Sequence, residues 1–546
     1  MTLACLNSNQ APPDGEYSVT TSINAQERYS YEVHNPRTGD KLYTVEEPAP
    51  GEITSAYERA RAAAVKLGAM TVRQRLDELR KLQRYILNNR DRIARRICEE
   101  TGKCINDAML AEIFPALDII AYYDKHAEKM LADRKMHTPI MLTGKKSHVI
   151  YEPLGVVLII SPWNYPFNLS FLPWVGAFVA GNAAIMKPSK ETPLRGLMEE
   201  MIAESGFMPD ALQVAYASRR TADLLIEAKP DKIHFTGSVG AGRKIMAKAA
   251  ELLIPVELEL GGKDPMIVFE DTDLERAVNG ALWGCFVNSG QTCTSVERIF
   301  VHQRIYDAFL ALFKEKTEKI ITLDHPEGRA DEFALTMGCM TAEFQIREIE
   351  EQLEQSIARG ARVITGGTRE PGTHRFKPTI IVDVTPDMPI QSRESFGPVV
   401  TVTPFQEEDE VIRLANDSPY GLSASVWSGD LERAWRVARR LVTGNVSINN
   451  ALATQANPAL PFGGIKDSGF GRYKGEIGLH AFSNIKSIQV DRNSNRLEGY
   501  WYPYSKEKFE LFSTIMEAAF GGGAFGLFKT IFNGLKLERF SRRHRL

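Results

Sequence analysis

The chain has 546 residues, of which 43% are hydrophobic and 25% charged, with a formal net charge of -3. This length exceeds one ordinary domain, so we expect two large lobes and smaller pieces. There is no basic excess, which argues against nucleic acid as a partner. Six cysteines in so long a chain do not make a disulfide framework, which indicates a reducing, cytoplasmic location.

Other classes of protein are disfavoured by what the sequence lacks. It contains no zinc-type CxxC pair and no HExxH motif, so no metal site is expected. Residues 1–17 do not form a charged region followed by an apolar one, so no secretory signal is expected. No uninterrupted apolar run reaches the roughly 18–20 residues that a membrane span requires.

The first 130 residues predict an arm, a hairpin and a set of helices. Residues 1–30 are polar and interrupted by Pro and Gly, as expected of a loose N-terminal arm. Two strand-like runs within 32–45 flank a turn and predict a hairpin. From 53 to 130 the pattern is helical, with breaks near Gly68 and Gly102.

Two series of alternating strand-like and helix-like segments follow, and each predicts a parallel sheet covered on both faces by helices. The fold class is therefore α/β, with two doubly wound lobes, and ligands of such sheets bind beyond the carboxyl ends of the strands. The strands expected in the first lobe are 155–160, 183–186, 213–216, 232–236 and 256–260. Those expected in the second are 265–269, 299–301, 362–365, 379–384, 399–405, 424–427 and 445–448.

One cysteine stands at a junction suited to chemistry. Cys293 ends the run Asn-Ser-Gly-Gln-Thr-Cys, between a helix-like segment at 274–286 and a strand-like segment at 298–301. A thiol there can face a cleft, and it attacks a carbonyl carbon well only as the thiolate, which requires a nearby base. Cys285, eight residues earlier, is expected to pack within the helix.

Two residues could assist the thiol. Glu259 lies between two leucines at a strand end, where burial raises a carboxyl pKa toward that of a general base; a buried structural salt bridge is the alternative. Asn164 follows an apolar strand. Its amide, with the backbone N–H of Cys293, could donate to a developing oxyanion, or it could simply cap the next helix.

Three further segments have the chemistry of a nucleotide site. Gly237, Ser238 and Gly242 open a helix directly after a strand, where backbone N–H groups favour a pyrophosphate, although a structural turn explains them equally well. Lys187 ends a strand and could reach a ribose or phosphate, or be an ordinary surface lysine. Glu394 could hold a ribose hydroxyl.

Phe396, two residues after Glu394, could flank a nicotinamide ring, or it could pack against a tight turn.

Together these segments resemble the aldehyde dehydrogenase superfamily from about residue 35 to residue 486. Glu259 and Cys293 have the family's separation of 34 positions, 293 minus 259. A late loop at 461–469 also resembles one that lies near the family's active site. The matching motifs, in family order, are Pro162-Trp163-Asn164, Lys187-Pro188-Ser189, Phe235-Thr236-Gly237-Ser238, Leu258-Glu259-Leu260-Gly261-Gly262-Lys263, Gly290-Gln291-Thr292-Cys293 and Glu394-Ser395-Phe396-Gly397-Pro398.

The resemblance implies a fold with a Rossmann-like cofactor domain, and a mechanism. Cys293 attacks the aldehyde carbon, Asn164 helps to hold the oxyanion, and Glu259 activates the water that hydrolyses the thioester. Glu259 favours hydrolysis, since members that transfer the acyl group to coenzyme A generally lack this acid. NAD or NADP is the implied cofactor, and the residues assigned to it are Trp163, Lys187, Ser189, Lys190, Gly237, Ser238, Gly242, Glu394 and Phe396.

Lys190 departs from the family pattern. The family often has an acid at this position, where it binds the adenosine ribose and disfavours a 2′-phosphate. A lysine removes that repulsion and can attract the phosphate. We therefore expect NADP to be accepted, with Glu191 next door able to support the use of NAD.

The chain also continues past the region of resemblance. Residues 500–504 are aromatic with one proline, and two segments with helical apolar spacing and a basic end follow. This extension looks like that of fatty aldehyde dehydrogenases, which favours medium- or long-chain aliphatic, or bulky aromatic, aldehydes. It could lie peripherally on an anionic membrane, or pack on its own protein or a partner subunit.

The expected domains are an arm (1–30), a cofactor-binding domain (31–132 and 152–261), a catalytic domain (262–480), an oligomerisation element (133–151 and 481–492) and the extension (493–546). Exposed edge strands in that element favour a homodimer or homotetramer. Two alternatives to oxidation of an apolar aldehyde stay open. One is a semialdehyde dehydrogenase with a small acidic substrate, and the other is a retired member that serves as a membrane-associated binding protein.

Overall fold

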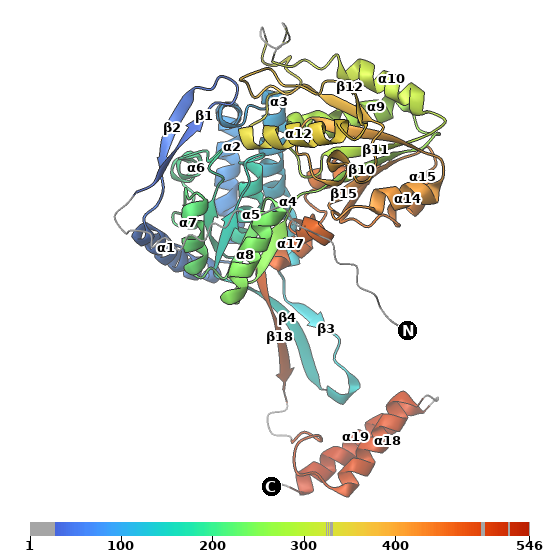
Figure 1. Ribbon diagram of the computed structural model, residues 1–546. Helices are drawn as coiled ribbons and strands as arrows, with labels where there is room; N and C mark the ends of the chain where they lie inside the picture. The colour runs from blue at the N-terminus through green and yellow to red at the C-terminus, as the bar shows by residue number, and fades with distance from the viewer. Residues whose placement is uncertain are drawn as a thin grey trace, which may run out of the picture.

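A computed structural model describes residues 28–142, 144–323, 325, 327, 331–492, 497–521 and 525–544. Two α/β lobes lie side by side, a three-stranded sheet projects from them, and a helical hairpin lies beyond its tip (Figure 1). This arrangement confirms the predicted fold class. Most of the predicted N-terminal arm lies outside the described residues.

The first lobe is built on a six-stranded sheet with strand order β17-β9-β8-β5-β6-β7. All strands are parallel except β17, and β5, β6 and β8 are buried throughout, as expected for strands covered on both faces. The bounds are β5 Val156–Ile160, β6 Ala183–Lys187, β7 Leu212–Val214, β8 Lys232–Thr236, β9 Val256–Glu259 and β17 Gly469–Phe470. The helices of this lobe are α1 Pro50–Ala69, α2 Val72–Thr101, α4 Phe114–Met130, α5 Asn168–Val179, α6 Leu197–Ser205, α7 Arg219–Glu227 and α8 Val239–Glu251.

Strand β17 differs from the expected domain boundary. It lies within 262–480, the range predicted for the catalytic domain, yet it pairs with β9 of the first lobe, with Gly469 opposite Glu259. Helix α17 (Gly475–Ala481) likewise packs on α4 and α5. The chain therefore returns to the first lobe before residue 480. A two-residue strand paired with one 210 residues earlier leaves no local pattern in the sequence.

The second lobe contains a seven-stranded sheet with order β12-β13-β14-β11-β10-β15-β16, parallel except for the edge strand β12. Its strands are β10 Asp264–Val268, β11 Val296–His302, β12 Arg362–Thr365, β13 Thr379–Val382, β14 Val399–Phe405, β15 Ser423–Trp427 and β16 Asn445–Ile448. Its helices are α9 Leu274–Phe286, η3 Val287–Gly290, α10 Tyr306–Thr317, α12 Glu343–Ile357, α13 Pro389–Ser392, α14 Glu408–Asn416, α15 Leu431–Ala438, α16 Ala453–Ala456 and η4 Lys466–Ser468.

The N-terminal region contains the predicted hairpin, strands β1 (Ser30–His34) and β2 (Lys41–Glu46), and then the helices. Helix α2 ends at Thr101 and is capped by Gly102, whose φ of +76° suits a glycine C-cap. The short helix α3 (Ile105–Ala108) then leads into a π-helical turn, η1 (Met109–Ile113), before α4. Helical structure was predicted here, but the π turn was not.

The projecting sheet joins two distant segments, as predicted. Its order is β18-β4-β3, with β3 Arg134–Met136, β4 Lys145–Pro153 and β18 Ser483–Asp491, all antiparallel; the short turn η2 (Ile140–Leu142) lies between β3 and β4. Strand β18 forms one edge of this sheet, and apolar side chains such as Ile485 on it are exposed. Its role in oligomerisation stays a prediction.

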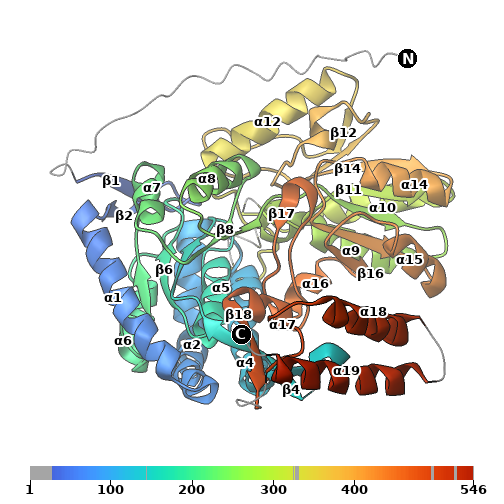
Figure 2. The same ribbon diagram turned by 90° about the horizontal axis from the view of Figure 1, so that it is seen from below.

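The C-terminal extension forms two helices, α18 (Lys506–Phe520) and α19 (Gly526–Arg543), which pack against each other (Figures 1 and 2). Ile515, Leu537 and Phe540 are buried there. Among the described residues, no helix combines the length and the apolar character that crossing a bilayer demands. The large apolar side chains exposed on the extension are Tyr500, Trp501, Tyr502, Tyr504, Phe509, Met516, Phe520, Phe525, Leu527, Phe528, Ile531, Phe532 and Leu535.

Candidate active site

The loop that carries Cys293 is held in a constrained conformation. Asn288 and Ser289 have φ of 53° and 56° and are followed by Gly290 at +70°, so three successive residues are left-handed. A Cβ on Gly290 would lie 2.1 Å from the carbonyl oxygen of Gly397, so only glycine fits. Cys293 then emerges partly exposed. Backbone strain of this kind is characteristic of functional loops.

Cys285 is buried in α9, which confirms that it packs within the helix. Cys293 is the partly exposed one among the free cysteines in the described part of the chain. Exposure is what a nucleophile requires, so the structure distinguishes the two thiols in the way that the sequence predicted.

Asn164 lies against the Cys293 loop. Its side chain is buried, and Nδ2 donates to the carbonyl oxygen of Gln291 at 2.9 Å. A primary amide has a second N–H, which is left to donate to a ligand oxygen. The prediction that Asn164 might only cap a helix is wrong, because α5 has Phe167 at its N-cap position and no side-chain cap.

Glu259 ends β9 and is 3% exposed. Neither carboxylate oxygen has a hydrogen-bond partner among the described residues, so the alternative of a structural salt bridge is not what the structure shows. Burial raises the pKa of this carboxyl well above its usual value and Glu257 raises it further, whereas Arg472 and Lys474 lower it. A buried carboxyl without a structural partner has the properties of a general base.

The Cys293 thiol has a raised pKa. Burial is the largest cause, and the carboxyls of Asp264, Glu394 and Glu259 add to it, so these side chains act on the same sulfur. The structure therefore places Glu259 close enough to the nucleophile for its charge to affect the thiol. Because the thiol is neutral at pH 7, its proton must leave before or during the attack on a carbonyl carbon.

Lys474 is a member of the site that the sequence did not indicate. It is 4% exposed, its Nζ donates to the carbonyl oxygen of Gln455 at 2.5 Å, and burial lowers its pKa to about 8, while Glu259 and Cys293 raise it. Gln455 also accepts a hydrogen bond from Thr294, next to the nucleophile, at 2.8 Å. Lys474 therefore supplies positive charge to a site rich in carboxyls.

Tyr473 enters the site in the same way. It is buried, and the charges of Glu259 and Cys293 contribute to its raised pKa after burial. Both residues follow directly after β17, whose pairing with β9 brings this segment beside Glu259. Only that distant pairing could have identified them, because nothing in the local sequence marks them.

On the cofactor side, Lys187 stands at the carboxyl end of β6. It is 8% exposed, so the alternative of an ordinary surface lysine is wrong. Its Nζ donates to the carbonyl oxygen of Pro188 at 3.2 Å, and burial lowers its pKa to about 8. Two of its three N–H groups remain for other acceptors.

Ser189 and Lys190 follow on the surface. The Ser189 hydroxyl accepts from the backbone N–H of Glu191 at 3.3 Å, and the Lys190 ammonium pairs with the Glu191 carboxylate at 3.4 Å. Arg219, at the start of α7, is close enough to Lys187 to lower its pKa. This region therefore presents several cations beside the strand end.

The start of α8 has the structural role that was predicted as one of its alternatives. Ser238 is the N-cap and accepts from the N–H of Ala241, and the N–H of Gly237 donates to the Glu259 carbonyl at 3.0 Å. A Cβ on Gly242 would lie 2.7 Å from the Leu260 side chain, so this glycine lets α8 approach the end of β9. Contact of these residues with a phosphate stays a prediction.

Glu394 lies against the segment that follows β9. Its Oε1 accepts from the N–H of Gly262 at 3.0 Å, and its pKa is raised to about 8, mainly by burial and further by Glu297. The ring of Phe396 meets that of Trp163 edge-on, with centroids 5.3 Å apart. The structure thus brings together two aromatic residues that the sequence assigned separately to the cofactor.

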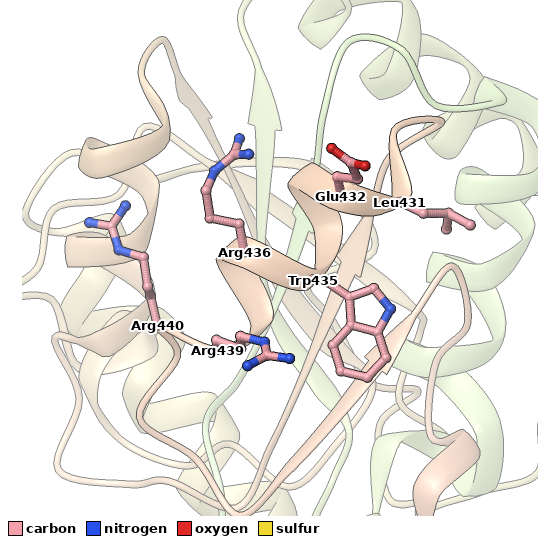
Figure 3. A pocket seen from close by; sticks show the side chains of 6 residues that line it. All are labelled: Leu431, Glu432, Trp435, Arg436, Arg439 and Arg440. Carbon is pink, nitrogen blue, oxygen red and sulfur yellow. The ribbon is translucent and has the colours of Figure 1, made fainter.

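A hollow on α15 lies apart from these residues. Figure 3 shows side chains that fan outward from α15 and from the turn that follows it, and Trp435 is exposed. It contains none of the predicted site residues, so we assign it no catalytic role. The residues that line the hollow are Leu431, Glu432, Trp435, Arg436, Arg439 and Arg440.

Among the described residues there is no cluster of His, Cys, Asp and Glu that could hold a metal ion.

Comparison with known proteins identifies the family. The model of the aldehyde dehydrogenase family matches residues 23–488. The chain is 39% identical to 4,4'-diapolycopene aldehyde oxidase of Methylomonas sp over 474 residues, which cover 86% of this chain and 88% of the relative. The chain therefore belongs to the aldehyde dehydrogenase family, and it is an enzyme of that class.

Solved structures of aldehyde dehydrogenases are also similar to this chain. A crystal structure of succinate-semialdehyde dehydrogenase from Burkholderia pseudomallei matches with a TM-score of 0.80 at 34% identity, covering 85% of this chain and 95% of that one. Betaine aldehyde dehydrogenase from Staphylococcus aureus, in complex with NAD+ and with a BME-modified cysteine, matches with a TM-score of 0.80 at 31% identity, covering 87% and 96%. The family uses NAD or NADP.

Proposed function

We propose that this protein oxidises an apolar aldehyde, of medium or long aliphatic chain or with a bulky aromatic group, to the carboxylic acid with NAD(P)+. The observation that carries the chemistry is the buried Glu259 carboxyl, which has no structural partner in the described part of the chain and acts electrostatically on Cys293. Hydrolysis, rather than transfer of the acyl group, is what a general base at this position supports.

The first half of the reaction forms a bond between the Cys293 sulfur and the aldehyde carbon, while the thiol proton passes to Glu259. The second N–H of the Asn164 amide and the backbone N–H of Cys293 stabilise the negative oxygen. NAD(P)+, held by the residues on the cofactor side, would supply the acceptor for the hydride that leaves this carbon. Loss of the hydride leaves a thioester on Cys293.

The second half releases the product. Glu259 takes a proton from a water molecule as its oxygen attacks the thioester carbon, and the carbon–sulfur bond breaks to give the acid and the Cys293 thiolate. The carboxyl must be deprotonated for this step, so the proton that it took from the thiol first passes to solvent. Lys474 and Arg472, which lower the pKa of Glu259, favour that state.

The residues on the cofactor side fit a dinucleotide. The buried ammonium of Lys187 has N–H groups to spare for ribose hydroxyls, and Glu394 could accept from hydroxyls of the second ribose. Trp163 and Phe396 form an aromatic wall beside Glu394. The N-terminus of α8 offers backbone N–H groups for phosphate, since the helix dipole favours an anion there.

We further propose that NADP is accepted. Lys190 stands where an acid would repel a 2′-phosphate, and Arg219 places another cation near Lys187. Glu191 partly neutralises Lys190 at 3.4 Å, which supports some use of NAD. The measurement is kcat/KM for each cofactor with one aldehyde, and a value for NAD far above that for NADP contradicts the proposal.

The preference for apolar aldehydes rests on the C-terminal hairpin and on one relative. The hairpin exposes many aromatic side chains, and a relative is named for oxidation of diapolycopene aldehyde. Exposed aromatic rings together with the basic end, Lys529, Lys536, Arg539, Arg542 and Arg543, also suit peripheral contact with an anionic membrane surface. The same surface could instead receive a partner subunit.

Truncation at about Asn495 tests this part of the proposal. Membrane binding and activity on long-chain aldehydes should both fall, while oxidation of a short, water-soluble aldehyde should persist, because the catalytic residues lie in the two lobes. Survival of both long-chain activity and membrane binding would contradict it. A loss of activity on every aldehyde would instead indicate a folding defect, which circular dichroism would detect.

A semialdehyde dehydrogenase is the second candidate, since a solved structure with that name shares the fold at 34% identity. A panel of aldehydes that varies chain length and terminal charge, run with NAD and with NADP, separates the two. A preference for a short acidic substrate would favour the second candidate. Absence of NAD(P)H formation with every aldehyde would support a retired, membrane-associated binding protein.

For assembly, we propose a homodimer or homotetramer formed through the projecting sheet. Strand β18 has an unpaired edge within the described chain and exposes Ile485, Ile488 and Val490, and such edges favour pairing with a second copy. Sedimentation of the intact protein measures this state, and an I485K/I488K variant should shift it toward the monomer.

A further inference from the structure

A fully buried ion pair, Lys103 with Glu112, lies against the loop that carries Asn164. The side chains of Lys103 and Glu112 are both 0% exposed, and Nζ lies 2.5 Å from Oε1. Removing two charges from water costs several kcal/mol per ion, which their attraction repays only when further hydrogen bonds complete the geometry. The pair is therefore a weak source of stability, and its contacts show what else it does.

Both ions bind the loop that carries Asn164. The Lys103 ammonium donates to the Asn164 carbonyl oxygen at 2.7 Å and lies 4.2 Å from the centre of the Tyr165 ring. The Glu112 carboxylate accepts from the backbone N–H groups of Phe167 at 3.0 Å and Asn168 at 2.9 Å through its Oε2. The two ends of the loop are thus fixed by one ion each.

The same loop is joined to the loop of the nucleophile. Asn288 donates through Nδ2 to the Asn164 carbonyl at 3.1 Å, so this oxygen accepts from both Lys103 and Asn288. The hydroxyls of Tyr165 and Thr292 lie 2.7 Å apart, and Thr292 directly precedes Cys293. Displacement of the Asn164 backbone would therefore disturb both donors of the oxyanion site.

The π-helical turn aims Glu112 at this loop. In η1 the backbone N–H of Phe114 bonds to the carbonyl of Met109, five residues back. Such a turn inserts one residue into an α-helix and is frequent at functional sites. From the neighbouring helix α3, Asp107 accepts from the backbone N–H of Asn288 at 3.0 Å. The α3–η1 segment therefore holds the two catalytic loops at once.

We propose that Lys103 and Glu112 are positioning residues that hold Asn164 and the Cys293 loop in the geometry required to bind the oxyanion. They touch neither the aldehyde nor the cofactor, and they act through the Asn164 backbone. This inference rests on the proposed role of Asn164 as an oxyanion donor. A displacement of about 1 Å at such a donor can cost about 100-fold in rate.

A double-mutant cycle between Lys103 and Asn164 tests the inference. The variants are K103M, N164A and K103M/N164A, with single-turnover formation of NAD(P)H from an aldehyde as the rate and fluorescence titration as the measure of cofactor Kd. K103M alone should slow the turnover about 10- to 100-fold, with the cofactor Kd changed less than about twofold. In the N164A background it should add less than about threefold, because residues that act as a unit are not additive.

R433M is the matched control. Arg433 pairs with Glu270 at 3.1 Å in the second lobe, away from the Asn164 loop, so losing this ion pair should leave the single-turnover rate unchanged. If K103M does not fold, as judged by circular dichroism, E112Q replaces it in the cycle, because glutamine keeps the size of the side chain.

The outcomes separate two failures. Equal effects of K103M in the wild-type and N164A backgrounds would overturn the positioning role, and so would a K103M rate equal to that of the wild type. An N164A variant with the wild-type rate would instead overturn the proposed role of Asn164, on which the inference rests.

Discussion

The Cys293 site and the C-terminal hairpin differ in whether their side chains are buried or exposed. In the site, Asn164, Glu259 and Lys474 are buried, and the side chains of Asn164 and Lys474 are fixed by hydrogen bonds to backbone carbonyls of distant loops. In the hairpin, large rings such as Phe520 and Phe528 are exposed. The chemistry of the site can therefore be derived from internal contacts, whereas the role of the hairpin depends on what it meets.

The strongest test of the buried side of this comparison is E259Q. General-base catalysis contributes about 10²- to 10⁴-fold, so steady-state kcat should fall by that order because the thioester can no longer be hydrolysed efficiently. A burst of one NAD(P)H per active site should remain but form more slowly, because the first half of the reaction also uses Glu259, to take the thiol proton. Stopped-flow absorbance at 340 nm measures both; a variant with the wild-type kcat would contradict the role of Glu259.

The cofactor side should respond next most strongly. In K190E a negative charge replaces the cation expected near the 2′-phosphate, so kcat/KM for NADP should fall about 10-fold relative to that for NAD, which corresponds to about 1.4 kcal/mol. K229E, at another exposed lysine before β8, is a charge-matched control. An unchanged ratio of the two cofactors would show that Lys190 does not face the phosphate.

The exposed side is tested by F528S/F532S. Both rings are exposed on α19, so binding to vesicles that contain anionic lipid should weaken about 10-fold, since the two lost rings together remove about 1.4 kcal/mol of apolar contact. Oxidation of a short aldehyde should not change. Flotation with vesicles measures the first effect; full retention of binding would favour a protein partner for this face.

The smallest expected effect concerns pH. Glu259 must be deprotonated, so kcat/KM should rise with pH through its raised pKa. Lys474 lowers that pKa while it is charged, so K474M should shift this rise to higher pH by about 0.5–1 unit. A pH–rate profile from pH 6 to 9.5 measures the shift. An unshifted profile would show that Lys474 holds the loop at Gln455 in place and does not affect the pKa of Glu259.

Much of the fold could be predicted because the signals are local. Helix α9 has the predicted bounds of 274–286, and buried parallel strands such as β5 are continuous apolar runs that pattern alone reveals. Glu259 and Cys293 stand where these elements end, so their placement followed from the same signals. The order of the family's motifs then assigned to one active site residues that lie far apart in the sequence.

The remaining parts depend on distant contacts. Lys474 reaches the site only because β17 pairs with β9, and Lys103 meets Glu112 only because of the π turn. Strands β17 and β9 lie about 210 residues apart, beyond any local window, whereas Lys103 and Glu112 are only nine residues apart and meet through a backbone turn that residue spacing does not predict. The hairpin was predicted as two helices from their spacing, but spacing could not tell whether their rings are buried within the protein or exposed.

Strand β17 also has a consequence for how this protein is made. The edge of the first sheet at β9 stays without its last strand until residues 469–470 have left the ribosome, although the other strands of that sheet end at residue 259. Contacts so far apart in sequence form late. A nascent chain halted before residue 469 would carry Cys293 and Glu259 yet lack the segment that places Arg472 and Lys474 beside them, so the charges around the thiol are not complete until residues 469–474 have been made and have paired with the first lobe.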